Sequence, residues 1–284
     1  MTQQVQTNAI FNHAYRFSRS NKKILIEQGG SRSGKTFNIL VWIIFDYCVN
    51  NTGHIITVCR KTFPSLRATV MRDFLDILKH YELYNEKHHN KSNSEYTING
   101  NTIEFISLDQ PAKIRGRKRN LLFVNECNEL DWDSWQQLIF RTQGKIIIDY
   151  NPSEANHWIY DKVEVREDAI FYKTTYKDNP FIDKNIIHEL ERLKETDDEY
   201  WQVFGLGERA LSRTQIFKFA VINKIPETAK FISIGIDFGY TNDPTTAVEV
   251  YQDEHSIYIN EMLYRTMMTT KDIHRFLLEN NTGN

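Results

Sequence analysis

The chain contains an eight-residue pattern typical of a phosphate-binding loop, Gly29-Gly30-Ser31-Arg32-Ser33-Gly34-Lys35-Thr36. The pattern lies between an apolar run at 24–26 and an apolar stretch at 37–49, which is the strand–loop–helix context that it requires. Its glycines let backbone N–H groups converge on an anion, and the following helix adds the positive end of its dipole. We expect Lys35 to reach the β- and γ-phosphates of a nucleotide and the Thr36 hydroxyl to hold Mg²⁺. The alternative is a glycine-rich turn that binds no nucleotide.

Hydrolysis of a nucleotide requires a second acidic site on a neighbouring strand. The apolar run 121–124 ends in Asn125-Glu126, and Glu126 would orient and deprotonate the attacking water. Asn125 stands where an aspartate that holds Mg²⁺ is expected, and the loss of one charge should weaken the retention of the metal. Glu126 would otherwise cap a helix that begins near Asp131. Glu129 is a weaker candidate, because it lies beyond the end of the strand.

Two arginine-containing features have more than one interpretation. Arg32 is either an internal arginine finger on the γ-phosphate or an ordinary surface arginine. A cluster of five cations within seven residues comprises Lys113, Arg115, Arg117, Lys118 and Arg119. This cluster contacts DNA phosphate, supplies Arg115 as a finger to a neighbouring subunit, or is a solubilising loop.

Composition narrows the class of protein. A length of 284 residues is about twice that of a typical domain, which predicts two domains. The net charge of −2 argues against a wholly basic nucleic-acid coat protein. Three scattered cysteines argue against a disulfide scaffold or a zinc ribbon and favour a reducing cytoplasm. No apolar run reaches the length of a membrane span, so we expect no membrane association.

The periodicity of apolar residues predicts the elements that position these side chains. Buried strands are expected at 24–26, 55–59, 121–124 and 145–149, and helices at 37–49, 69–80 and 183–203. This alternation indicates an α/β domain with a mostly parallel sheet. Asn99-Gly100 predicts a hairpin turn. A second, strand-rich region follows, with strands at 231–237, 245–251 and 256–263 and a helix that begins at 270.

Several motifs, in order along the chain, resemble the large subunit of tailed-bacteriophage terminases, which package DNA into procapsids. They are the phosphate loop at 29–36, Cys-Arg-Lys-Thr-Phe-Pro-Ser-Leu-Arg at 59–67, Lys-Ile-Arg-Gly at 113–116, Phe-Val-Asn-Glu-Cys-Asn-Glu at 123–129, Asp-Tyr-Asn-Pro at 149–152 with Asn-His-Trp-Ile-Tyr at 156–160, Thr-Tyr-Lys-Asp-Asn-Pro-Phe at 175–181, and Gly-Ile-Asp-Phe-Gly-Tyr-Thr-Asn-Asp-Pro-Thr at 235–245. The phosphate loop alone is shared by many nucleotide hydrolases. The Asn-Pro segment with its His-Trp partner and the Asp-Phe-Gly-Tyr segment are more specific to the family.

The resemblance implies a fold and a set of partners. The fold is an ASCE-type, RecA-like P-loop ATPase over 1–207, a linker over 208–229, and the first part of an RNase H-like nuclease over 230–284. The implied cofactors are ATP and Mg²⁺, with Mg²⁺ or Mn²⁺ for the nuclease. The implied partners are double-stranded DNA, a small terminase subunit and a portal protein, on which the chain forms a homo-oligomeric ring in the host bacterial cytoplasm.

The resemblance also implies roles for single residues. Asn151 is similar to the residue that senses the γ-phosphate after the fourth strand and couples its loss to movement of DNA. Arg60 matches the arginine that follows the second strand of the family. Phe11 and Tyr15 are expected near the adenine.

Two departures from the family pattern stand out. The family has an acid at the position of Asn125. Asp237 resembles the first metal-binding carboxylate of the nuclease, but cleavage by two metal ions needs several carboxylates to hold ions about 4 Å apart. Asp243 is most simply a turn residue and Glu261 a surface acid on a strand. The resemblance places the other catalytic acids of the family on a later strand and on a helix near the C-terminus. Since 271–284 do not supply these acids, we expect a fragment or a truncated gene product.

Two other functions are compatible with the same residues. The first is a helicase-like, DNA-dependent ATPase, which would need a second RecA-like domain. The second is a non-catalytic module that holds ATP and docks to a portal or small subunit.

Overall fold

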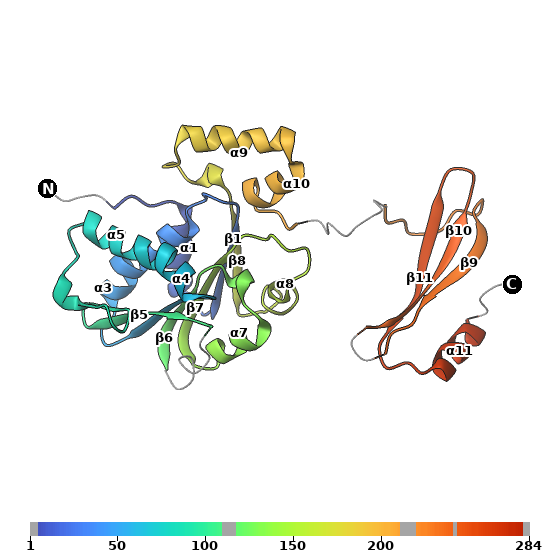
Figure 1. The fold of residues 1–284 in the computed structure, drawn as a ribbon, viewed down its shortest axis with the longest axis horizontal. Coiled ribbons are helices and arrows are strands. Elements are labelled where there is room, and N and C mark those ends of the chain that lie inside the picture. Colours follow the sequence, from blue (N-terminus) through green and yellow to red (C-terminus); the bar gives the residue numbers. More distant parts are fainter. Residues whose placement is uncertain (1–4, 110–117, 211–219, 241–242, 281–284) are drawn as a thin grey trace. The chain divides into compact units, whose positions relative to one another are not determined.

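The computed structural model describes residues 5–109, 118–210, 220–240 and 243–280. The chain divides into two compact units, Met1–Ile216 and Phe217–Asn284 (Figure 1). The predicted linker over 208–229 includes residues 211–219, which lie outside the described residues. Each unit is therefore described by itself.

An eight-stranded sheet forms the centre of the first unit, in the order β3-β4-β5-β2-β6-β7-β1-β8. The strands are β1 (Ile24–Gly29), β2 (Ile55–Arg60), β3 (His89–Asn90), β4 (Glu95–Ile98), β5 (Asn101–Ser107), β6 (Arg119–Val124), β7 (Thr142–Tyr150) and β8 (Ala169–Thr174). From β5 to β8 all neighbours in this order are parallel, whereas β3, β4 and β5 form an antiparallel edge. The four predicted core strands and the hairpin turn are confirmed.

Helices cover both faces of this sheet and make a three-layer sandwich (Figure 1). The α-helical segments among the described residues of this unit are α1 (Ala9–Ser18), α2 (Lys35–Trp42) with α3 (Cys48–Asn50), α4 (Phe63–Leu66) with α5 (Arg72–His80), α7 (Trp132–Ile139), α8 (Trp158–Lys162), α9 (Lys184–Thr196) and α10 (Asp198–Tyr200). One apolar core contains residues of α1, α2 and α5, and the other contains residues of α7 and α8. Alternate residues of β1 enter opposite cores, as the two-residue period of a strand requires.

The elements of this unit that were not predicted include α1 and β8. In α1, Ile10, Ala14 and Phe17 are buried at helical spacing, but exposed aromatic and polar neighbours obscured the period. In β8 only Thr174 is buried, and the more exposed positions include the apolar Phe171 as well as Lys173, so exposure does not follow residue type. The expected single helix over 183–203 is wrong, because Asp197 leaves the helical conformation and its side chain caps α10.

The second unit contains an antiparallel sheet in the order β11-β10-β9, followed by one helix. Its elements are β9 (Lys230–Asp237), β10 (Thr245–Gln252), β11 (Ile257–Arg265) and α11 (Thr270–Glu279). Thr269 and Asp272 form a capping box at the start of α11, as expected for a helix that begins at 270. In the part of the chain that the structure describes, no helix has the length and apolar character needed to cross a membrane.

Gly207 packs against the base of the phosphate loop. It has a positive φ of +66°, and a Cβ at this position would lie 2.7 Å from the Gly30 nitrogen and 2.9 Å from the Gly29 carbonyl carbon. Its carbonyl also accepts a 2.7 Å hydrogen bond from Gln28 Nε2. The segment after α10 is thereby held to the end of β1.

We predict that Gly207→Ala lowers the free energy of unfolding of the first unit by about 3 kcal/mol, from left-handed strain together with a backbone clash. Gly53→Ala is the matched control, since Gly53 has a φ of +72° but no atom within 4 Å of its Cβ position. The control should lose only about 1 kcal/mol. Urea unfolding followed by tryptophan fluorescence measures both, because all five tryptophans belong to this unit. Equal losses in the two variants would show that the close approach contributes nothing.

Candidate active site

The phosphate loop connects β1 to α2, as predicted, and neighbouring side chains brace its backbone. Gly34 has a φ of +85° and stands at the N-cap of α2. Asn8 Nδ2 donates to the Ser33 carbonyl at 2.9 Å, and Asn38 Nδ2 donates to the Gly34 carbonyl at 2.9 Å. Residues 31–37 line a cavity of about 300 Å³ together with Asp73, Glu126 and Asn151. The sequence thus brings the predicted loop, Glu126 and Asn151 around one cavity.

Lys35 is buried at the base of this cavity. Its Nζ donates to the carbonyls of Gly29 and Gly30 at 3.1 and 3.0 Å and to Asn151 Oδ1 at 2.9 Å. Burial lowers the pKa of Lys35 below its ordinary value of 10.5, while the nearby carboxylates of Asp149 and Glu126 oppose that shift. The ammonium and Asn151 are therefore in direct contact at the place predicted for the γ-phosphate.

Asp149 lies at the centre of the polar contacts beside Thr36. Thr36 Oγ1 donates to Asp149 Oδ2 at 2.7 Å, and Asn125 Nδ2 lies 3.1 Å from Thr36 Oγ1 and 3.0 Å from Asp149 Oδ1. The backbone N–H of Glu126 also donates to Asp149 Oδ1, at 2.8 Å. Asp149 is only 1% exposed, and burial raises its pKa. Asn125 and Thr36 were predicted at this place, whereas Asp149 had no predicted role.

Glu126 lies at the edge of the cavity, directly after β6, and has left-handed backbone angles of φ 52° and ψ 56°. Such strain in a non-glycine residue is typical of functional positions. Burial, helped by the charge of Asp149, raises the pKa of Glu126 to about 7, so the carboxyl can exchange a proton near neutral pH. The alternative that Glu126 caps α7 is wrong, because the Asp131 side chain accepts the Ser134 N–H at 2.7 Å.

The two arginines of the sequence analysis have different surroundings. Arg32 is exposed at the mouth of the cavity, and its backbone carbonyl accepts a 2.8 Å hydrogen bond from Asn179 Nδ2. Arg60 instead forms a paired contact with Glu129, with N–O distances of 2.6 and 3.1 Å, and donates to Thr69 at 3.0 Å. Glu129 is thus the partner of Arg60, which explains its position beyond the strand end.

Phe11 and Tyr15 lie on α1, where they were expected to be near an adenine. Phe11 packs against the apolar core, and the Arg19 guanidinium lies 3.6 Å above the ring of Tyr15. Of the cationic cluster at 113–119, residues 113–117, with Arg115, lie outside the described residues. Lys118 is exposed, whereas Arg119 is buried in β6.

Asp237 is exposed at the end of β9 in the second unit. Asp243 and Glu261 are exposed as well. Among the residues that the structure describes, no three His, Cys, Asp or Glu side chains are grouped so that they could hold a metal ion. The role of Asp237 in a nuclease site stays a prediction.

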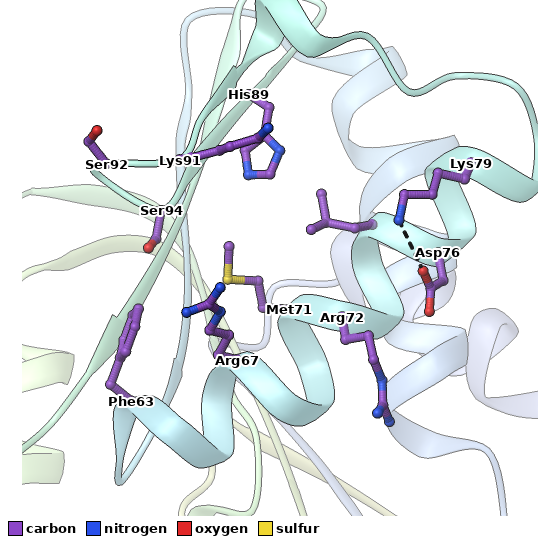
Figure 2. A pocket seen from close by; sticks show the side chains of 11 residues that line it. Phe63, Arg67, Met71, Arg72, Asp76, Lys79, His89, Lys91, Ser92 and Ser94 are labelled. Atoms are coloured by element: carbon purple, nitrogen blue, oxygen red, sulfur yellow. Dashed lines mark hydrogen bonds and ion pairs between the residues drawn. The ribbon is translucent and has the colours of Figure 1, made fainter.

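A second cavity in the first unit, of about 630 Å³, lies between the α4–α5 segment and the β3–β4 edge of the sheet (Figure 2). Burial lowers the pKa of His89 in this lining, so its charged side chains near pH 7 are the four cations Arg67, Arg72, Lys79 and Lys91 and one acid, Asp76. Lys79 pairs with Asp76 at 3.5 Å, and Lys91 and Arg72 pair with Glu86 at 2.5 Å and Asp73 at 3.9 Å, so acidic neighbours partly offset the positive charge of this basic cavity. Such a lining suits a polyanion.

Comparison with known proteins assigns the family. A family model described as phage terminase large subunit matches residues 21–208, which include the phosphate loop, Glu126 and Asn151. The chain belongs to this family. Among curated relatives, the PBSX phage terminase large subunit of Bacillus subtilis (strain 168) is 23% identical over 279 residues, which cover 85% of this chain and 64% of that protein. The large terminase subunit of Bacillus phage SPP1 is 23% identical over 282 residues, with 89% and 66% covered.

This terminase chain therefore spans about two thirds of the length of these relatives. Its fold matches that of the large terminase from a thermophilic bacteriophage, with a TM-score of 0.63, 18% identity, and 97% and 74% of the two chains covered. A structure of the same thermophilic-phage terminase in complex with ADP matches with a TM-score of 0.59, 19% identity, and 98% and 75% covered. The predicted α/β architecture with its mostly parallel sheet is confirmed.

Proposed function

We propose that this chain is the ATP-driven motor part of a phage terminase that translocates viral DNA into procapsids. The observation that carries the proposal is the convergence of Lys35, Glu126 and Asn151 on one cavity at the phosphate loop. The complex of the thermophilic-phage large terminase with ADP supports a nucleotide as the occupant. Membership of the terminase family supports DNA as the substrate that is moved.

The mechanism follows from the groups around the cavity. Glu126 accepts a proton from the attacking water, for which a carboxyl with a pKa of about 7 is suited. Lys35 and the loop N–H groups bind the phosphates, and Arg32 stabilises charge on the γ-phosphate from the mouth of the cavity. Asn151, in contact with Lys35, responds to the loss of that phosphate.

The residues around Thr36 fit Mg²⁺, which prefers oxygen ligands and binds through few protein groups together with substrate phosphates. Asn125 Oδ1 is a buried acceptor without a partner, and it suits a metal-bound water. Thr36 and Asn125 would therefore take part in holding the ion. When bound, Mg²⁺ supplies positive charge to the phosphates and orients them.

The proposal extends to the assembly and to the second unit. Its partners would be double-stranded DNA, a small terminase subunit and a portal protein, on which the chains form a ring in the host cytoplasm. The β-rich second unit would begin an RNase H-like nuclease with Asp237 as a ligand for Mg²⁺ or Mn²⁺. The helicase-like alternative is less favoured, because the described part of this unit is an antiparallel sheet and not a second RecA-like domain.

The test is turnover of ATP by the purified chain at millimolar Mg²⁺, with and without double-stranded DNA, together with a strand-unwinding assay. We expect hydrolysis that DNA stimulates and no unwinding. A chain that binds an ATP analogue without turning over ATP would support the docking-module alternative. Failure to bind the analogue at all would contradict the proposed function.

The basic cavity of Figure 2 is a proposed contact for DNA phosphate. We predict that Arg72→Ala combined with Lys91→Ala weakens DNA binding about tenfold at low salt and lowers the salt dependence by about two ions. The control is Arg192→Ala with Lys194→Ala, which removes two cations from α9. Fluorescence anisotropy with labelled duplex at several salt concentrations measures both. Equal affinities of the two double variants would exclude this cavity as a DNA contact.

A further inference from the structure

We propose that Asp149 supplies the carboxylate of the Mg²⁺ site that Asn125 cannot supply. The metal-binding carboxylate of this chain therefore lies on β7 and not at the end of the neighbouring strand β6. The inference rests on the proposed function, since it concerns the metal that accompanies the nucleotide. It assigns a metal-binding role to a residue outside the predicted site. A carboxylate from Asp149 would also restore the negative charge whose absence at Asn125 was expected to weaken the retention of Mg²⁺.

Strand register places the two side chains at the same level. β6 and β7 are parallel, and Val124 pairs with Ile148, so Asn125 and Asp149 are the next residues on neighbouring strands. On its other side β7 pairs with β1, where Asp149 is opposite Glu27. Asp149 is therefore on the strand between the one that carries Glu126 and the one that leads into the phosphate loop. A carboxylate on β7 is adjacent to the loop, whereas one on β6 is a strand further away.

The contacts of Asp149 point it at the hydroxyl that would bind the metal. Its Oδ2 accepts the hydroxyl of Thr36, the only threonine of the phosphate loop, at 2.7 Å. Asn125 Nδ2 donates to both carboxylate oxygens, at 3.0 and 3.2 Å, and holds the group in this orientation. A cation that displaces the hydroxyl proton from Asp149 would find two oxygens, Thr36 Oγ1 and Asp149 Oδ2, already side by side. Asn125 then acts as a positioning residue, with its unpaired Oδ1 free for a metal-bound water.

A purely structural role does not account for the charge. The hydrogen bonds that Asp149 accepts from Thr36, Asn125 and the Glu126 N–H need acceptor oxygens but no negative charge. A carboxylate that is 1% exposed is costly to bury unless cations compensate it. Lys35 is one such cation, because its charge favours the ionised form of Asp149, and a divalent ion between Asp149 and the phosphates would be a second. Mg²⁺ sites of this kind use one or two carboxylates and complete the shell with phosphate oxygens and water.

The experiment titrates Mn²⁺ into the full chain saturated with ADP and detects free Mn²⁺ by electron paramagnetic resonance. Three variants are compared with the wild type. Asp149→Asn removes the charge at constant shape, and the exchange Asn125→Asp with Asp149→Asn returns the carboxylate to β6. Asp133→Asn, an exposed residue in the first turn of α7, is the matched control. The affinity for ADP in EDTA is measured first, because it tests the nucleotide site without any metal.

We expect Asp149→Asn to weaken Mn²⁺ binding about 10- to 100-fold, the range seen when groups that support a metal are lost. Its metal-free ADP affinity should change less than about threefold. The exchange variant should recover Mn²⁺ binding to within about threefold of the wild type, and Asp133→Asn should be unchanged. The exchange variant keeps both residue types and the net charge, so it gives an answer even where Asp149→Asn does not fold.

Two results would overturn the inference alone. One is wild-type Mn²⁺ affinity in Asp149→Asn. The other is an exchange variant as weak as Asp149→Asn, since the loss would then come from a disturbed loop and not from a missing charge. A wild-type chain that binds no ADP in EDTA or in Mn²⁺ would instead reject the proposed function, and the inference with it.

Discussion

Lys35→Ala is expected to lower kcat/KM for ATP by at least about 10²- to 10³-fold, the loss typical of removing one group that stabilises transition-state charge. The ammonium is the only side-chain cation that donates to Asn151 in the described part of the chain. Its loss also removes a cation that faces the carboxylates of Asp149 and Glu126. Because these carboxylates would then repel the phosphates, ATP binding should weaken as well. Steady-state hydrolysis and binding of a fluorescent ATP analogue measure the two effects.

The matched control for this prediction is Lys173→Ala. Lys173 lies on β8, where it is exposed and pairs with Glu208. This surface ion pair contributes little to stability, so turnover and analogue binding should stay within about twofold of the wild type. Turnover by Lys35→Ala close to that of the wild type would mean that the loop binds no hydrolysed nucleotide, and the proposed function would fail.

The strands of the parallel sheet were predictable because each is apolar on both faces. Helices cover both faces of this sheet, so the residues at 121–124 and 146–148 are continuously hydrophobic. The edge strand β8 lacks this signal, since Phe171 and Lys173 are exposed and only Thr174 is buried. Its place is set by pairing with β1, where Gly29 approaches Thr174 so closely that a Cβ would lie 2.4 Å from the carbonyl oxygen. That contact links residues far apart in sequence and has no local signature.

The candidate site was predictable where one segment contains the whole pattern. The phosphate loop is such a segment, and so is Glu126 at the end of an apolar run. Asp149 was missed because its importance depends on which strand lies beside β1, and periodicity does not reveal strand order. The run 145–149 does end in an acid, as 121–124 ends in Asn125-Glu126. Treating every polar strand end as a possible neighbour of the loop would have included Asp149 among the candidates.

The Glu126 capping alternative shows a second limit of local patterns. Glu126 and Asp131 both lie in the segment between β6 and α7, and acidic residues are common before the first turn of a helix. The structure assigns the cap to Asp131, through hydrogen bonds from the Ser134 backbone and hydroxyl. Glu126, by contrast, has a left-handed backbone and lines the cavity. The sequence pattern does not distinguish the two acids. Their backbone conformations and hydrogen bonds, which only the structure gives, show which one caps the helix.

Glu126→Gln is expected to reduce kcat by about 10²- to 10⁴-fold, the contribution of a positioned general base, with analogue binding kept. The amide has the shape of the carboxyl but cannot accept the proton of the attacking water. Glu167→Gln, an exposed position in the turn before β8, serves as the control and should be unchanged. An active Glu126→Gln variant with wild-type kcat would transfer the base role to another group.

The pH dependence separates a base from a merely structural acid. Because the pKa of Glu126 is raised to about 7, kcat of the wild type should rise about tenfold per pH unit below pH 7 and level off above it. Residual hydrolysis by Glu126→Gln should lack this ascending limb.

The free energy of unfolding should depend on pH in the opposite direction to kcat. The folded pKa exceeds the ordinary value of 4.5, so the folded wild type loses stability as pH rises from 4.5 to 7 and the buried carboxyl ionises. Glutamine escapes that loss, so the variant should resist urea better than the wild type at pH 8 and equally at pH 4; a variant weaker at pH 8 would mean that the charge of Glu126 is compensated within the fold, and its raised pKa would be wrong.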